Sequence, residues 1–409
     1  MDDASRAEPK FDTEVSSPAL CDPFAAKGFD PAVADLPAPS SFVVHSHLRW
    51  DFVWQRPQQL LSRLAPQSPV LFIEEPLATD SEPHLAITEP QPNVVRVVPH
   101  VAPHISTADA QSLETLRLLQ PALASHPLLA GRFQRPVQWF YSPMPAPVML
   151  GRFDASCVVY DCMDELANFR FAPADIVVRE RLLLTKAHVV FTGGYQLYAS
   201  KSRHHRNVHF YGCGVDAKHF ARARHADTQP PKELAALPRP VLGYYGVIDE
   251  RLDYELIASL GDALPAASIV MVGPLAKVDA ATLPQRTNLH WLGQRRYDEL
   301  PAIVKAFDVC LMPFALNEAT QYINPTKTLE YMAAGKPIVS TAVPDVVRNF
   351  TPIVEIARSH AEFISAIECA WSQPNQDRLQ QGIECANAAT WEAIVAAMRR
   401  HIAEASSPH

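Results

Sequence analysis

The sequence predicts an α/β protein with two Rossmann-like, doubly wound parallel-sheet domains. From residue 41 onward, short apolar runs recur and each is followed by a longer amphipathic stretch. This alternation is typical of parallel strands covered by helices on both faces. The series is interrupted by a polar, proline-containing segment at residues 222–237 and then starts again. That interruption indicates a linker and a second domain.

Four segments follow from this pattern. Residues 1–40 are rich in Pro, Ala, Asp and Ser without periodicity, and we expect a flexible leader there. Residues 41–225 are expected to form the N-terminal domain, residues 226–375 the C-terminal domain and residues 376–409 a closing helix. Sheets of this kind bind ligands beyond the carboxyl ends of their strands, so we expect the functional site in a cleft between the two domains.

The individual elements are read from apolar runs and amphipathic stretches. In the first half, strands are expected at residues 42–45, 70–73, 94–98, 137–141, 157–160, 189–192 and 208–211, and helices at 57–65, 108–124, 176–186 and 195–203. In the second half, strands are expected at residues 241–245, 268–272, 289–292, 309–312, 338–340 and 353–356, and helices at 252–263, 297–306, 325–334, 361–372 and 376–405.

Composition and charge narrow the class of protein. The net charge is −8, which argues against a nucleic-acid partner. No run approaches the roughly 20 apolar residues of a membrane span, so any membrane contact would be peripheral. The first 40 residues lack the apolar core of a signal peptide, and the seven cysteines show no C-x-x-C spacing. We therefore expect a cytoplasmic protein, with contact at the inner face of the membrane left open.

The segment from Asn324 to Thr341 carries the strongest chemical signal. Asn324 can cap a short helix, and the N-terminus of a helix attracts phosphate groups. Lys327 lies in the first turn, where a cation opposes the helix dipole unless an anion binds beside it. Glu330, one turn later, could accept two hydrogen bonds from a ribose diol. The alternative is that Lys327 and Glu330 are solvated charges on an ordinary capped helix.

The whole string P-T-K-T-L-E-Y-M-A-A-G-K-P-I-V-S-T resembles the donor-nucleotide motif of GT-B glycosyltransferases. The resemblance is to the retaining family 4 (group 1) enzymes of bacterial exopolysaccharide and cell-wall synthesis. It implies that Glu330 contacts the ribose and that Thr326 and Lys327 face the diphosphate. It also implies no bound metal and no cofactor, because the nucleotide sugar is a substrate. Many members carry a sugar-binding glutamate where this chain has Tyr322, so the donor sugar stays open.

The resemblance also assigns roles to the two halves. The N-terminal domain would bind the acceptor and the C-terminal domain the nucleotide-sugar donor, and the final helix would pack back on the first domain. Gly246, after the first strand of the second half, would let the backbone approach the donor. The family's Arg–Lys pair is out of register there, which makes Arg251 the candidate cation for the diphosphate. The alternative pairs Arg251 with Asp249 or Asp253 at the surface.

The loop after the first strand concentrates polar and aromatic residues. Tryptophans and charged groups at a strand end suit sugar stacking and hydrogen bonding. His45 is a candidate catalytic residue, and the candidates for binding the acceptor or lining the cleft are His47, Trp50, Asp51 and Arg56. The alternative is a structural loop whose aromatic residues are anchored in the core.

A second group of candidates follows two later strands. Asp161, Asp164 and Glu165 come after the strand at 157–160 and could form an acidic metal site. Because the resembled enzymes need no metal, we favour Asp164 as the residue that orients or deprotonates the acceptor hydroxyl. A helix-capping role is the alternative for Asp164 and Glu165. Ser142 follows the strand at 137–141 and is expected to border the cleft.

These observations predict a hexosyltransferase-like glycosyltransferase. It would move a sugar from a nucleotide diphosphate sugar, UDP- or GDP-linked, to a carbohydrate or lipid-linked acceptor with retention. Two alternatives stay open: a sugar-nucleotide epimerase or phosphorylase on the same fold, and a non-catalytic sugar-binding partner in a polysaccharide assembly system.

Overall fold

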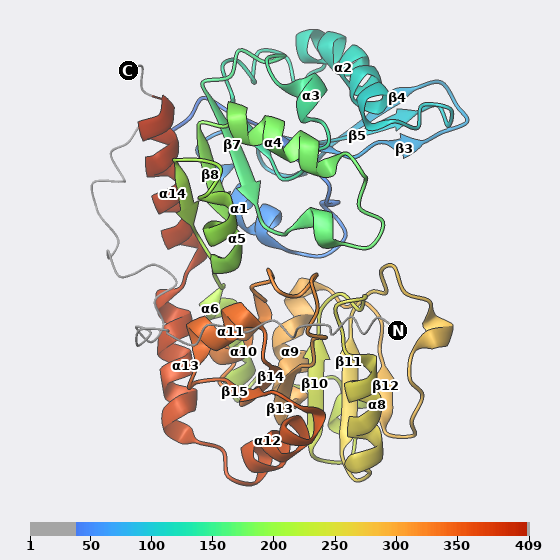
Figure 1. Ribbon diagram of the computed structural model, residues 1–409, viewed down its shortest axis with the longest axis vertical. Coiled ribbons are helices and arrows are strands. Elements are labelled where there is room, and N and C mark those ends of the chain that lie inside the picture. The colour runs from blue at the N-terminus through green and yellow to red at the C-terminus, as the bar shows by residue number, and fades with distance from the viewer. Residues whose placement is uncertain (1–37, 407–409) are drawn as a thin grey trace, which may run out of the picture.

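The computed structural model describes residues 38–406, which form two α/β domains stacked along the long axis (Figure 1). The N-terminal domain is built on a nine-stranded sheet in the order β3-β5-β2-β1-β6-β7-β8-β9, with β4 paired to β5. Its strands are β1 (Phe42–Ser46), β2 (Val70–Glu74), β3 (Leu77–Ala78), β4 (His84–Gln91), β5 (Val94–Val101), β6 (Val137–Phe140), β7 (Cys157–Cys162), β8 (Val189–Thr192) and β9 (Val208–Phe210). All pairs are parallel except β4 with β5.

Helices cover both faces of this sheet, which explains why its central strands are apolar along their whole length. One face packs on α1 (Arg56–Leu64) and α14 (Trp391–Ser406), which share a core cluster with β1. The opposite face packs on α2 (Ala108–Ser125), α3 (Ala146–Met149), α4 (Ile176–Lys186) and α5 (Tyr195–Lys201).

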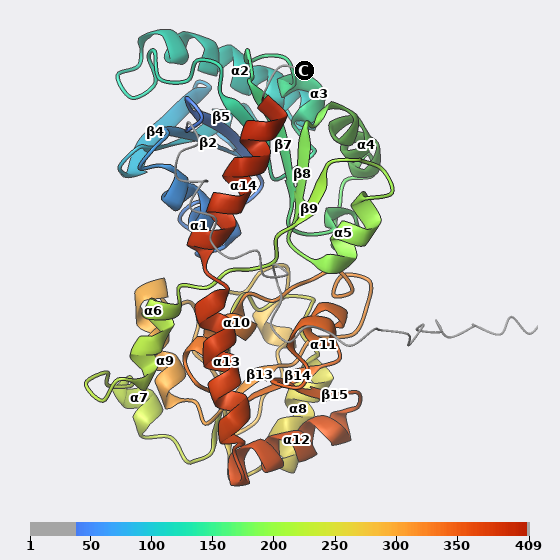
Figure 2. The same ribbon diagram turned by 90° about the vertical axis from the view of Figure 1, so that its left-hand side faces the viewer.

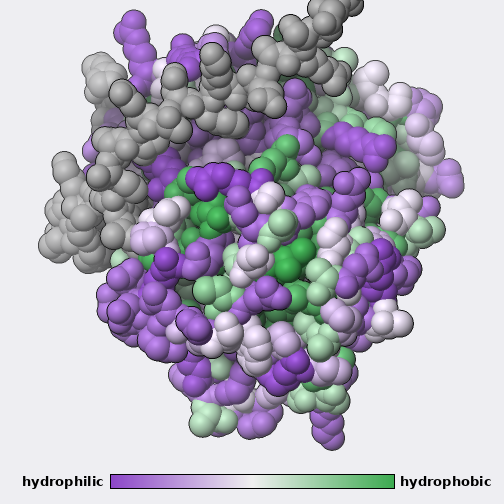
Figure 3. All heavy atoms as spheres, turned by 60° about the horizontal axis from the view of Figure 1, so that its bottom comes forward, coloured by the Kyte–Doolittle hydropathy of each residue, from purple (hydrophilic) through white to green (hydrophobic). Residues whose placement is uncertain are grey.

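The C-terminal domain has a six-stranded, all-parallel sheet in the order β12-β11-β10-β13-β14-β15. Its strands are β10 (Val241–Tyr245), β11 (Ser268–Val272), β12 (Leu289–Trp291), β13 (Val309–Met312), β14 (Ile338–Thr341) and β15 (Glu355–Ala357). Its helices are α6 (Ala217–Ala221), α7 (Lys232–Ala235), α8 (Tyr254–Ala263), α9 (Leu300–Ala306), α10 (Lys327–Ala333), α11 (Pro344–Phe350), α12 (His360–Ser372) and α13 (Gln376–Ala388). On the lower end of this domain, hydrophobic residues lie in separate patches among hydrophilic ones (Figure 3).

The predicted closing helix is wrong in one respect. The helix is interrupted at Ala389 and Thr390, which separate α13 from α14. The Thr390 hydroxyl accepts a hydrogen bond from Ala393 N at the start of α14. As a result α13 stays on the C-terminal domain, where Gly382 lies against Met332, and only α14 crosses to the N-terminal domain (Figure 2).

The boundary between the domains also lies earlier than residue 225. Val215, Phe220 and Ala223 belong to the core of the C-terminal domain, so the first domain ends near the last residues of β9. The segment 222–237 is not a plain linker, because it contains α7 and a short 3₁₀ turn. Nearly all of the predicted leader, residues 1–37, lies outside the described residues. Between residues 38 and 406, no helix combines the length and apolarity that crossing a membrane requires.

Candidate active site

The start of α10 places Lys327 at the carboxyl edge of the C-terminal sheet. Its ammonium lies 5.2 Å from the ring centroids of both Tyr244 and Phe314. Within the described part of the chain the ammonium forms no ion pair, and burial, followed by the charge of Arg251, lowers its pKa to about 8. Lys327 is therefore a mainly protonated cation at neutral pH that forms no direct ion pair, although the charges of Glu330 and Asp249 act on it.

Two glycine turns make room in front of Lys327. Gly246 has φ +143°, and a Cβ built on it would lie 3.0 Å from Cε of Lys327. A Cβ on Gly273, with φ +150°, would lie 1.8 Å from the carbonyl oxygen of Gly246. Both backbones are thus in conformations that side chains rarely adopt, and the two turns can lie against each other only as glycines. The backbone approach predicted for Gly246 has a geometric basis.

Glu330 lies one turn after Lys327 on the same helix. Its side chain is buried, and Oε2 accepts a hydrogen bond from the Tyr245 hydroxyl. Burial raises the pKa of this carboxyl to about 7, against the lowering effects of the Tyr245 hydrogen bond and Lys327. Among the described residues Oε1 has no hydrogen-bond donor, so one oxygen is held in place and the other stays free to bind.

The predicted cap of α10 is wrong. The helix begins at Lys327 with Thr326 in the cap position, and neither Thr326 nor Asn324 makes a capping hydrogen bond. Both side chains instead reach the N-terminal domain. Asn324 Nδ2 donates to the Gly193 carbonyl at 3.1 Å, and the Thr326 hydroxyl donates to Cys213 Sγ at 3.0 Å. These residues therefore join the two domains beside the helix start.

Arg251 is held by a carboxylate of its own loop. Its guanidinium donates to both oxygens of Asp249, at 2.7 to 3.1 Å, which is the pairing that the sequence left as an alternative. The pair does not stand apart from the site, however. The Arg251 guanidinium lies 5.6 Å from the ring centroid of Phe169 in the N-terminal domain, and its charge lowers the pKa of Lys327. A contact between Arg251 and a diphosphate stays a prediction.

The three carboxylates after β7 separate into different environments. Asp161 is fully buried and pairs with Arg56 at 3.0 Å, and Glu165 accepts hydrogen bonds from Lys201 at 2.8 and 2.9 Å. Of the three carboxylates, only that of Asp164 accepts no hydrogen bond from the described residues, although the Asp164 carbonyl accepts one from Cys162 Sγ. Burial raises the pKa of Asp164 to about 6, opposed first by Arg251 of the C-terminal domain. Across residues 38–406 no group of acidic, histidine or cysteine side chains is arranged to hold a metal ion.

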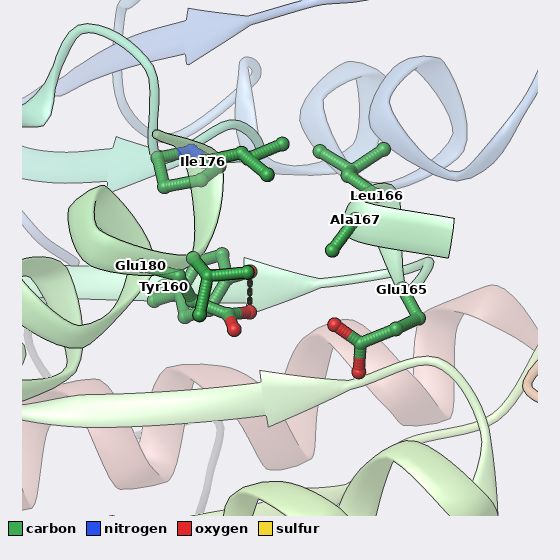
Figure 4. Close-up of a pocket in the computed structure, with 8 residues that line it drawn as sticks. Tyr160, Glu165, Leu166, Ala167, Ile176 and Glu180 are labelled. Atoms are coloured by element: carbon green, nitrogen blue, oxygen red, sulfur yellow. Dashed lines mark hydrogen bonds between the residues drawn. The ribbon is translucent and has the colours of Figure 1, made fainter. Parts of the chain in front are cut away.

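Glu165 also borders a small hollow in the N-terminal domain. Leu166, Ala167 and Ile176 lie along one side of it, and Glu165 and the hydrogen-bonded pair of Tyr160 and Glu180 lie along the other (Figure 4). Lys201 donates hydrogen bonds to both glutamates and so offsets part of their negative charge.

His45 does not reach the cleft, so its prediction as a catalytic residue is wrong. The ring lies inside the sheet, stacked on Phe140 with 4.6 Å between centroids and 3.1 Å from Gln138 Nε2. Burial lowers its pKa to about 3, which keeps it neutral. His47, two residues later, lies at the domain boundary, where burial and then the charge of Lys277 lower its pKa to about 4.

Three further candidates in this loop have structural partners. Trp50 is buried against Phe72, with 5.1 Å between ring centroids, so it anchors the loop in the core as the alternative anticipated. Asp51 forms an ion pair with Arg96 on β5. Arg56 is buried and bonds Asp161 and the Tyr211 carbonyl, so it cannot bind an acceptor. The burial of Trp50 and Arg56 contradicts their predicted acceptor contacts, whereas an acceptor contact of the exposed Asp51 stays a prediction.

Arg56 should instead matter for stability. We expect Arg56→Met to lower the free energy of unfolding by about 3–5 kcal/mol, because it leaves Asp161 buried without its partner. Urea denaturation followed by circular dichroism measures this loss. Arg63→Met on the same helix is the control, since its partner Glu392 is exposed and its loss should cost about 1 kcal/mol or less. Equal effects of the two variants would contradict the role given to Arg56.

Ser142 and Tyr322, which the sequence placed near the cleft and the donor sugar, both have structural contacts. Ser142 is buried behind β6, where its hydroxyl accepts a hydrogen bond from Met144 N at 3.3 Å, so it shapes the loop. Tyr322 packs against the apolar cluster of the N-terminal domain that contains Leu197. Its ring is thereby committed to the domain contact and does not replace the family's sugar-binding glutamate.

The sequence missed residues that join the domains. Asp345 is fully buried in the C-terminal domain, and its Oδ2 accepts a hydrogen bond at 2.7 Å from Tyr195 N at the start of α5. Lys277 has φ +58° and lies over Phe169, 5.1 Å from the ring centroid. No local sequence pattern predicts either contact, because each contact joins residues that are more than 100 positions apart.

Comparisons with known proteins agree with this geometry. Residues 239–373, which contain Gly246, Arg251, Lys327 and Glu330, match the family model described as glycosyl transferases group 1. A Bacillus subtilis (strain 168) protein is 25% identical over 284 residues, or 64% of this chain and 70% of its own length. It is named teichuronic acid biosynthesis glycosyltransferase TuaH, an assignment that the name marks as provisional.

Solved structures match both domains together. Sucrose-phosphate synthase from Thermosynechococcus elongatus has a TM-score of 0.67 at 15% identity, covering 88% of this chain and 97% of that one. An E. coli trehalose-6-phosphate structure bound with UDP-2-fluoro glucose has a TM-score of 0.65 at 13% identity, with coverage of 89% and 99%. A UDP-forming trehalose-phosphate synthase from Burkholderia xenovorans has a TM-score of 0.63 at 14% identity, with coverage of 90% and 100%.

The chain is a GT-B glycosyltransferase. The matched segment of this glycosyltransferase holds the glycine turns and α10, and Asp164 in the other domain interacts electrostatically with Arg251 of the same segment. The two domains of the fold thus bring together an unpaired ammonium, a half-engaged carboxylate and a carboxylate of raised pKa. The roles of the individual residues are taken up next as proposals.

Proposed function

We propose that this glycosyltransferase transfers a sugar from a UDP-linked donor to a hydroxyl group of a carbohydrate acceptor, with retention at the anomeric carbon. The observation that carries the proposal is the pairing of Lys327 with Glu330 on one helix face. An ammonium that forms no direct ion pair suits a diphosphate, and a carboxylate with one free oxygen suits a ribose diol.

Transfer breaks the bond between the anomeric carbon and the diphosphate oxygen and forms a bond to the acceptor oxygen. Negative charge grows on the leaving diphosphate, and Lys327 beside the Gly246 turn stabilises it. Asp164 faces this region from the N-terminal domain and orients the acceptor hydroxyl or takes up its proton.

The choice of UDP and of retention rests on similarity. One structural neighbour is bound with UDP-2-fluoro glucose and another is named UDP-forming. The string from Asn324 to Thr341 resembles the donor motif of the retaining enzymes. Teichuronic acid biosynthesis in the name of the Bacillus relative favours a cell-surface polysaccharide as the acceptor.

A panel of sugar nucleotides tests the proposal. Purified protein is incubated with each UDP- and GDP-linked sugar and with oligosaccharide acceptors, and proton NMR follows nucleotide release and the anomeric configuration. We expect turnover of a UDP sugar and a product of the same configuration. A product of inverted configuration would overturn the proposed retention. Conversion of the donor into a second sugar nucleotide without acceptor would favour the epimerase.

The raised pKa of Asp164 predicts the acid limb of the pH profile. An ionised carboxylate is needed to accept a proton, so we expect kcat to fall as pH drops through about 6, not near 3.8, the ordinary value for Asp. The linked effect on stability has the opposite sign. The folded chain holds this proton more tightly than the unfolded chain, so stability falls as pH rises between 3.8 and about 6. A kcat profile flat down to pH 5 would exclude this role.

A further inference from the structure

Apolar side chains gather in solvent just before and at the start of α4. Phe171 is 79% exposed, Val178 67% and Val177 41%. Phe171 also has φ +67°, a left-handed conformation that costs a bulky residue free energy. The fold therefore holds a large aromatic ring outward at an energetic cost, and no packing within the described chain repays it.

These residues adjoin the cleft side of the N-terminal domain. Val177 also lines the hollow beside Glu165 and Leu166, which lies at the carboxyl ends of β6 and β7. Asp164 follows the same strand β7. The exposed apolar surface is thus continuous with the part of the domain that faces the proposed site.

Basic residues lie beside this apolar surface and along α4 to its far end. Arg181 is exposed on α4, and its spacing of four and three residues from Val177 and Val178 puts all three on one helix face. The Arg170 guanidinium lies 5.3 Å from the ring centroid of Phe171. Lys186 ends α4. A bond of 3.1 Å between His205 and the Ala187 carbonyl brings in two more exposed cations at this end, Arg203 and Arg206.

These cations are not neutralised locally. Arg170, Arg181, Lys186, Arg203 and Arg206 form no ion pair within residues 38–406. The nearby acids are already engaged: Lys201 holds Glu165 and Glu180, and Arg179 holds Asp175 at 2.6 Å. A chain of net charge −8 thus presents a locally basic surface with an apolar edge.

We propose that this surface docks the enzyme on an anionic lipid bilayer. We call it the α4 face, formed by Phe171, Val177, Val178, Arg170, Arg181, Lys186, Arg203 and Arg206. Apolar side chains insert at the boundary between headgroups and acyl chains, and neighbouring cations bind anionic headgroups. Neither part needs a sugar nucleotide, so the proposal stands or falls independently of the proposed function.

Sedimentation with vesicles tests the proposal on the full-length protein. Vesicles of phosphatidylcholine with phosphatidylglycerol are compared with vesicles of phosphatidylcholine alone, at low and high salt. We expect binding to the anionic vesicles that weakens with salt. The double variant Phe171→Ser with Val178→Ser should lower the partition coefficient by about tenfold or more, and Arg181→Glu by about tenfold.

Matched changes outside the face serve as controls. Trp371→Ser removes another exposed ring, on α12, and Lys232→Glu reverses another exposed charge, on α7. Both should bind vesicles as the unmodified protein does, and circular dichroism checks that every variant is folded. Three results would overturn the proposal: no sedimentation with anionic vesicles at low salt, an equal loss in the controls, or a dimer formed through this face in place of vesicle binding.

Discussion

Replacing Lys327 with Met is expected to lower kcat for sugar transfer by roughly 100- to 1,000-fold. The ammonium lies 5.2 Å from the ring centroids of Tyr244 and Phe314 and forms no direct ion pair with a described residue, so it can bind the leaving diphosphate. Met keeps most of the side-chain volume and removes the charge. Steady-state kinetics with saturating donor and acceptor measure the loss.

The fold should survive this change. Partial burial disfavours the charged form of Lys327 and lowers its pKa, so Lys327→Met should leave the melting temperature unchanged or raise it. Lys232→Met on the distant helix α7 is the control for loss of a lysine and should keep full activity. If Lys327→Met turned over at the unmodified rate, the diphosphate could not depend on this residue.

Asp164→Asn is expected to lower kcat by about 100- to 10,000-fold. The amide keeps the shape of the side chain but cannot accept the proton of an acceptor hydroxyl. Donor affinity should change little, because the groups proposed to hold the nucleotide lie in the other domain. Separate measurements of kcat and of UDP affinity distinguish this outcome from misfolding. A parallel loss of UDP binding would place Asp164 in the donor site instead.

Much of the fold is accessible from the sequence, because parallel strands buried on both faces leave continuous apolar runs. The strands β8, β10, β11 and β13 have the predicted bounds. The strand β4 was missed because it is an exposed, antiparallel strand at the edge, with polar residues and Pro90 in place of an apolar run. Helix α11 was also missed, although Pro344 stands at its first position.

In the candidate site, too, contacts between residues close in the sequence were predictable and long-range contacts were not. Lys327 and Glu330 share one helix, so their relation is local and follows from a spacing of three residues. The contacts that bury His45 and Arg56 are made with residues far away in the sequence. Arg56 meets Asp161, 105 positions later, and the burial of His45 depends on Gln138, 93 positions later. A loop rich in polar and aromatic residues has the same composition whether it binds a sugar or anchors a sheet.

The contacts between the two domains could not be predicted from the sequence either. Asn324 was predicted to cap α10, yet its side chain bonds the Gly193 carbonyl across the domain boundary. The capping pattern needs only neighbouring residues, whereas the observed bond spans 131 positions. Tertiary contacts of this kind override local preference at the ends of short helices.

Calorimetric titration of UDP into the unmodified protein and into Lys327→Met tests the donor site most directly. We expect one UDP site on the unmodified protein, with affinity at least about tenfold weaker in the variant, since a charge-assisted contact contributes about 1.5–3 kcal/mol. Equal UDP affinities in the two proteins, or no UDP binding to the unmodified protein, would contradict the assignment of a nucleotide diphosphate to the start of α10.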